Sequence, residues 1–71
     1  MDGYPAYRFD NVRHNGTELE NVYAPVAPGE NLLQAMAFHL AAEMNLHVGM
    51  DSLISWDSVT RVGTWDTPKS L

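Results

Sequence analysis

The sequence contains no cysteine, which excludes disulfides and thiolate metal sites as supports for the fold. At 71 residues the chain buries only about 60% of the surface that it exposes when unfolded, so its stability margin is small. A lack of cysteine is also typical of proteins in a reducing compartment. We therefore expect one small domain over residues 1–71, located in the cytoplasm or, for a viral product, in the host cytoplasm.

Long hydrophobic runs are missing as well. No stretch approaches the roughly 20 apolar residues that a membrane-spanning helix needs, so we expect no membrane association. The first ten residues, MDGYPAYRFD, have neither a basic start nor an apolar run, and we expect no secretory signal. Residues 1–6 and 66–71 are expected to be flexible, as chain ends usually are.

Basic residues are few and scattered. The chain has 4 lysine and arginine residues against 9 acidic residues, which gives a formal net charge of −5. Nucleic-acid binding normally uses a clustered basic face to displace counterions from phosphates, so we expect no direct nucleic-acid binding. An acidic surface is better matched to a basic protein partner, because opposite charges steer the encounter.

A β-hairpin is predicted around HNGT at residues 14–17, because Asn15 and Gly16 both tolerate positive φ. Its strands are expected at about 7–13 and 17–23. Two registers compete for this hairpin. A two-residue loop pairs Arg13 with Glu18 and splits the apolar side chains between both faces. A three-residue loop with Gly16 in a bulge pairs Arg13 with Thr17 and is favoured, since it gathers apolar side chains on one face. These side chains are Tyr7, Phe9, Leu19 and Tyr23.

The second half of the chain predicts a helix and further strands. Asn31 is a suitable N-cap with Gln34 as its capping-box partner, and the helix should run to about Asn45. Residues 51–66 are rich in β-branched and aromatic side chains, which predicts a strand at 59–65 and a shorter strand or turn at 53–56. The predicted fold class is α+β: a small ββαβ or ββαββ domain with one helix packed on a three- to four-stranded antiparallel sheet.

The predicted helix has apolar side chains on two sides. Phe38 lies between the small residues Ala35 and Ala42, roughly opposite the stripe that should face the sheet. Exposing a phenylalanine forfeits roughly 1.5–3 kcal/mol of burial free energy. We therefore expect Phe38 to be covered by Tyr4 or Pro5 of the N-terminal segment, by a second copy of the chain, or by another protein. The stripe expected to face the sheet consists of Leu32, Leu33, Met36, Ala37, Leu40 and Met44.

Few residues suggest chemistry. His39, Glu43 and His47 follow one another at four-residue steps and are weak candidates for a metal site, although their spacing differs from the His-Glu-x-x-His pattern. The serine and aspartate residues at 51–58 lack the strained turn that exposes a nucleophile, and the chain has no glycine-rich phosphate loop. The sequence predicts no enzyme, no catalytic residue, no bound metal and no cofactor.

A chain of this size cannot easily enclose a substrate pocket and keep a core. We interpret it as a non-enzymatic protein-binding module, a compact acidic regulator or inhibitor that docks on a larger, basic cytoplasmic protein or nucleoprotein complex. Small acidic inhibitors encoded by phages share this size and charge sign. The alternative is a self-associating structural or assembly subunit, a homodimer through the helix. The predicted partner-binding residues are Phe38, Ala35 and Ala42 on the helix, with Asp10, Glu18 and Glu20 as acidic determinants.

Overall fold

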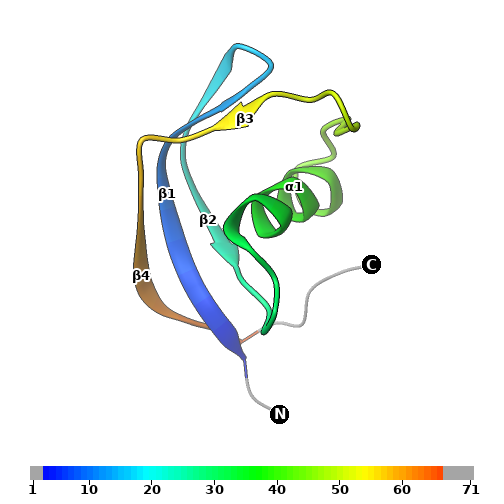
Figure 1. The fold of residues 1–71 in the computed structure, drawn as a ribbon. Coiled ribbons are helices and arrows are strands. Elements are labelled where there is room, and N and C mark those ends of the chain that lie inside the picture. The colour runs from blue at the N-terminus through cyan, green and yellow to red at the C-terminus, as the bar shows by residue number, and fades with distance from the viewer. Residues whose placement is uncertain (1–2, 67–71) are drawn as a thin grey trace.

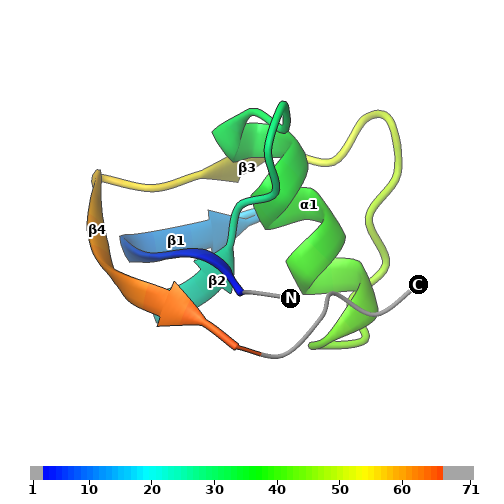
Figure 2. The same cartoon turned by 90° about the horizontal axis from the view of Figure 1, so that it is seen from below.

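One long strand organises the domain. The computed structural model describes residues 3–66 and contains a four-stranded antiparallel sheet with one helix across one of its faces (Figures 1 and 2). The elements in chain order are β1 (Tyr4–His14), β2 (Thr17–Pro25), α1 (Leu32–Ala42), β3 (Ile54–Ser55) and β4 (Ser58–Trp65). The predicted α+β class is confirmed, with the short fourth strand present. Residues 4–6, expected to be flexible, instead pair within β1, while residues 1, 2 and 67–71 lie outside the described range.

The strand β1 lies at the centre of the sheet. It pairs with β2 along one side and with β4 and then β3 along the other side, in each case antiparallel. Tyr4 is opposite Trp65 at one end of this second side, and His14 is opposite Ile54 at the other. The segments β3 and β4 therefore act as one interrupted partner strand, broken at residues 56 and 57.

The hairpin closes with a two-residue turn. Arg13 pairs with Glu18 and His14 pairs with Thr17, while Asn15 and Gly16 have φ angles of 51° and 86°. Two successive positive φ angles define a type I′ turn, whose twist matches that of the flanking strands. The favoured three-residue loop is therefore wrong.

Two bulges explain why that register was misjudged. Between the pairs Phe9–Val22 and Val12–Glu20, β1 contains one residue more than β2, and Asn11 has a φ of 56°. A second irregularity follows at Glu20, with a φ of 63°, and restores the register. In a regular strand Phe9 and Val12 would point to opposite faces, but the extra residue brings both into the core. The expected apolar face is wrong for Tyr23, which is exposed.

The core lies between the sheet and the helix. Trp56, in the break between β3 and β4, meets the ring of Phe9 edge to face, with the ring centroids 5.0 Å apart. This geometry suits the aromatic quadrupoles and adds to the area that the rings bury. The buried residues of the cluster are Phe9, Val12, Val22, Ala24, Met36 and Leu40.

The start of α1 follows the prediction closely. The Gln34 backbone N–H donates to the Asn31 side-chain oxygen at 2.8 Å, and the Asn31 N–H donates to the Gln34 side-chain oxygen at 3.0 Å. This is the predicted capping box. The helix ends at Ala42, earlier than expected, and Asn45 adopts a φ of 58°. The Leu46 N–H donates to the Leu40 carbonyl and directs the chain away from the helix axis.

The buried face of α1 overlaps the predicted one, since Met36 and Leu40 are fully buried and Leu32 packs on the core, but it is shifted around the helix. Leu33 and Met44, expected to face the sheet, are exposed, whereas Ala35, expected on the far side, is fully buried. His39 is also buried and lies edge to face against Trp65 at the end of β4, with 5.8 Å between ring centroids. Because β4 extends to this flank, the helix presents it to the protein interior. No helix within residues 3–66 is both long and apolar enough to cross a bilayer.

Candidate functional site

The exposed apolar side chains concentrate on the helix and the connection that follows it. Six large hydrophobic side chains are exposed in the described part of the chain, and two of these, Tyr23 and Val62, belong to strands. The other four come from α1 and residues 43–53. We call these four residues the helix–loop surface: Leu33, Met44, Met50 and Leu53. Several exposed apolar side chains on adjoining segments of a small protein often mark an interaction site.

Leu33 lies in the first turn of α1, whereas Met44 lies two residues beyond the end of the helix. At about 3.6 residues per turn, Leu33, Ala37 and Ala41 follow one flank of α1, and none of them is fully buried. This flank borders the buried face of the helix, which consists of Ala35, Met36, His39 and Leu40. Leu33 therefore exposes apolar surface on a side of the helix that was predicted to face the sheet.

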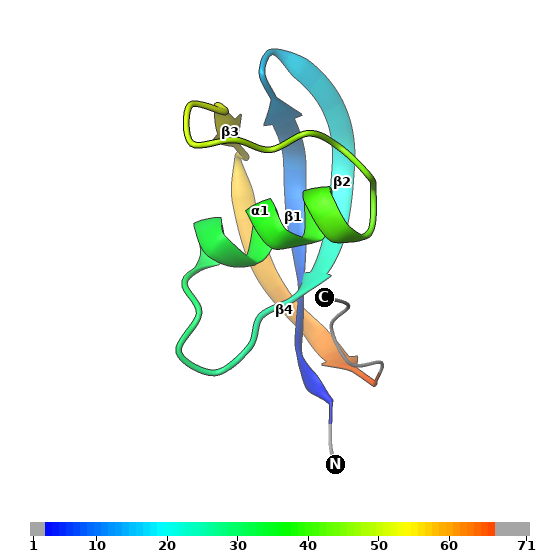
Figure 3. The same cartoon turned by 90° about the vertical axis from the view of Figure 1, so that its right-hand side faces the viewer.

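The connection holds the other two residues in a defined turn. It leaves the end of α1 and runs back along the helix to β3 (Figure 3). The Gly49 N–H donates to the Ser52 hydroxyl at 2.8 Å, and the Ser52 N–H donates to the Gly49 carbonyl at 3.2 Å. These two hydrogen bonds close a tight turn with Met50 at its tip, fully exposed to solvent. Partly buried Leu46 and Val48 pack on the core and anchor the segment that leads into the turn.

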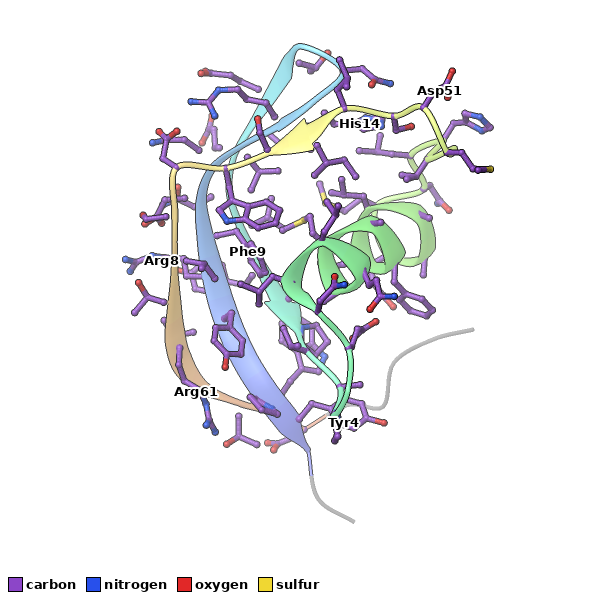
Figure 4. The ribbon with its side chains drawn as sticks, in the orientation of Figure 1. Tyr4, Arg8, Phe9, His14, Asp51 and Arg61 are labelled. Atoms are coloured by element: carbon purple, nitrogen blue, oxygen red, sulfur yellow. The ribbon has the colours of Figure 1, made fainter. Side chains whose placement is uncertain are left out.

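The other face of the sheet carries paired charges. The Arg8 guanidinium donates to Asp10 at 2.8 Å, and the Ser58 hydroxyl donates to the same carboxylate at 2.7 Å. The Ser58 hydroxyl and then the Arg8 guanidinium hold the pKa of Asp10 below its ordinary value. Arg8 points away from the helix, on the opposite side of the sheet (Figure 4).

A second ion pair lies further along the sheet. Arg13 donates to Asp57 at 2.8 Å, and the Asn11 side-chain amide donates to the other oxygen of Asp57 at 2.9 Å. The Arg13 guanidinium and then the Asn11 amide lower the pKa of Asp57. Arg8 and Arg13 are therefore each neutralised by a carboxylate of the same chain. Alternating, internally paired charges of this kind are typical of a solvated sheet face.

The structure separates the predicted partner-binding residues into two groups. Ala35 is fully buried, Phe38 is half-buried and Ala42 is exposed, all on the flank of α1 away from Leu33. On the hairpin, Asp10 is part of the ion pair with Arg8, whereas Glu18 and Glu20 are exposed. The two groups lie on different elements and do not form one surface. Sequence reasoning missed all four residues of the helix–loop surface. It assigned Leu33 and Met44 to the face that packs on the sheet, and it did not predict the structure of the connection that carries Met50 and Leu53.

The candidate metal ligands are not brought together. His39 is buried against Trp65, Glu43 is the last residue with helical geometry, and His47 lies in the connection beyond the helix. Within residues 3–66, no three histidine, cysteine, aspartate or glutamate side chains are placed to share a metal ion. The four-residue spacing has no geometric consequence here because the helix ends before His47.

The architecture defines a small α+β domain with one helix and one antiparallel sheet. Comparisons of the chain with protein-family models, with curated proteins and with solved structures give no match.

Proposed function

We propose that this chain is a small, acidic, non-enzymatic protein-binding module that regulates or inhibits a larger, basic cytoplasmic protein. The helix–loop surface carries this proposal. Four large apolar side chains are exposed there, although a domain of this size has only about 5 kcal/mol of folding free energy to spare. Their exposure is compatible with folding and is best explained by a partner that covers them.

The chemistry of the surface suits adaptable binding. Two of its four residues are methionines, whose unbranched and polarisable side chains fit irregular partner surfaces. The turn at residues 49–52 is closed by its own hydrogen bonds, so Met50 is presented in a defined position before any partner arrives. Such preorganisation reduces the entropy lost on association.

A site-specific crosslinking experiment tests this proposal. Benzoylphenylalanine replaces Leu33 or Met50 in two variants, and Tyr23 or Val62 in two matched controls that carry exposed apolar side chains on strands. Each variant is produced in the cells that naturally make the chain and is irradiated there. We expect the two helix–loop positions to trap the same protein and the two strand positions not to trap it. Mass spectrometry identifies the adduct.

The purified adduct partner then provides a second measurement. Isothermal titration calorimetry should show binding to the wild-type chain and at least about tenfold weaker binding to a Leu33→Ser variant, which corresponds to about 1.4 kcal/mol. Adducts of equal yield at all four positions, or none at Leu33 and Met50, would overturn the proposal. An adduct of twice the chain mass would instead support the self-associating subunit.

A further inference from the structure

We propose that the helix–loop surface binds a basic amphipathic helix. This inference rests on the proposed function and names the chemistry of the partner. It follows from three properties of the surface: its apolar side chains, the sign of the charges beside them, and the shape of a helix flanked by a turn. Each is a separate observation.

The apolar part of the surface fits one face of a helix. Leu33, Ala37 and Ala41 follow one another at four-residue steps along one flank of α1, and Met44 lies two residues beyond the end of the helix. Small residues such as Ala37 and Ala41 let a second helix approach closely. Since α1 has 11 residues at about 1.5 Å rise each, it offers a track of roughly 16 Å, enough for about three turns of a partner helix.

The charges nearest to this surface in the sequence all have one sign, and Arg13, on the strand that pairs with β3, is held in its ion pair with Asp57. Between residues 14 and 60 the sequence contains acidic side chains but neither lysine nor arginine. Glu43 directly precedes Met44, and Asp51 directly follows Met50, so both are exposed next to apolar members of the surface. Figure 4 shows Asp51 in the connection, remote from Arg8 and Arg61. A partner that covers Met44 and Met50 therefore brings its polar rim against carboxylates.

This charge pattern favours a basic partner over a second copy of the chain. A second copy would bring the same acidic residues and another formal charge of −5 to the interface. Like charges brought together disfavour association, whereas lysine and arginine on the polar face of a helix would pair with Glu43 and Asp51. An amphipathic helix with an apolar stripe and basic flanks would place its leucines on the apolar side chains and its lysines beside these carboxylates. The occupant is thus a foreign basic amphipathic segment rather than another copy of the chain.

A peptide panel tests the inference. The probe is a fluorescein-labelled peptide of about 16 residues with leucines at helical spacing and lysines on the opposite face. One control has the same composition in scrambled order, and a second has glutamate in place of every lysine. Binding to the full chain is measured by fluorescence anisotropy at about 0.05 M and 0.5 M salt.

We expect the amphipathic basic peptide to bind at least about tenfold more tightly than either control, and to weaken as salt is raised. A Leu33→Ser/Leu53→Ser variant should lose at least about tenfold in affinity for this peptide. The matched Tyr23→Ser/Val62→Ser variant should bind like wild type. Circular dichroism confirms that each variant is folded, which is expected because all four side chains are exposed.

The outcomes separate this inference from the proposed function. If the scrambled peptide bound equally well, the attraction would depend on charge alone. If the glutamate peptide bound equally well, the surface would not distinguish basic from acidic partners. Either result overturns the inference. A dimer in sedimentation equilibrium that is abolished by Leu33→Ser would identify a second copy as the occupant and overturn it too. If crosslinking traps a partner but no peptide binds, the protein-binding function stands and the helical partner is rejected.

Discussion

Asn15 and Leu53 exchange two hydrogen bonds across 38 positions of the sequence. The Leu53 backbone N–H donates to the Asn15 side-chain oxygen at 2.7 Å, and the Asn15 backbone N–H donates to the Leu53 carbonyl at 2.8 Å. The tip of the hairpin thereby holds the end of the connection that carries the exposed turn. Asn15, which was predicted only as a turn residue, therefore also positions part of the candidate binding surface.

Replacing Asn15 tests this double role. Asn15→Gly keeps the left-handed backbone but removes the side-chain acceptor, and should lower the free energy of unfolding by about 0.5–1.5 kcal/mol. Asn15→Ala should cost about 1–2 kcal/mol more, because alanine is strained at a φ of 51°. Urea denaturation measures both. Asn15→Asp keeps an acceptor and is the control; if all three variants unfolded alike, the hydrogen bond to Leu53 would contribute nothing.

Two helix positions test which flank of α1 is buried. Leu33→Gln should change the free energy of unfolding by less than about 0.5 kcal/mol, since this side chain is 53% exposed. Ala35→Gln should be severely destabilising, because a larger polar group must enter a fully buried position. Thermal melts by circular dichroism distinguish the two. If Leu33→Gln were more destabilising than Ala35→Gln, the helix face predicted from periodicity would be the buried one.

The bulge at Glu20 gives a backbone prediction. Glu20 has a φ of 63°, a conformation that costs most side chains about 1–2 kcal/mol relative to glycine. Glu20→Gly should therefore preserve or raise stability, whereas Glu20→Val should lower it, because a β-branched residue tolerates this region least. Chemical denaturation of both variants provides the measurement. A stabilising valine would mean that the strand pairs without this bulge.

Acid should weaken the polar face of the sheet. The pKa values of Asp10 and Asp57 are lowered in the folded chain, so their stabilising contribution is complete above the ordinary aspartate value near 3.8. It is lost as pH falls further through the folded values. We expect the melting temperature of the wild type to drop between pH 5 and 2.5, and that of Asp10→Asn/Asp57→Asn to drop less. Asp51→Asn, which removes a carboxylate outside both ion pairs, should follow the wild type; parallel curves for all three proteins would contradict the assignment.

Signals between near neighbours predicted much of the fold. The Asn31–Gln34 capping box, the Asn15-Gly16 turn and the strand that became β4 all depend on residues a few positions apart. Interactions at that range are the same in almost any tertiary context, so the residue types suffice to infer them. The α+β class followed from the order of these elements.

The candidate site depended on contacts that no local pattern contains. Leu33 and Ala35 are both apolar, so periodicity alone could not decide which one faces the sheet. The hairpin register was mispredicted for a similar reason. The alternation of apolar and polar residues along a strand cannot reveal the bulges at Asn11 and Glu20, although the first of these brings Phe9 and Val12 to one face. In both cases the deciding partner lies far away in the chain.

The amino-acid sequence by itself determined the element order, the helix cap, the position of the hairpin turn and the acidic charge, because each depends on composition or on near neighbours in the chain. Only the tertiary structure decided which flank of α1 is covered. Trp65, at the end of β4, lies against His39 on one flank of α1, whereas Leu33 on the other flank stays exposed. Burial depends on how all elements of the domain pack together, and this packing decides which apolar side chains remain exposed.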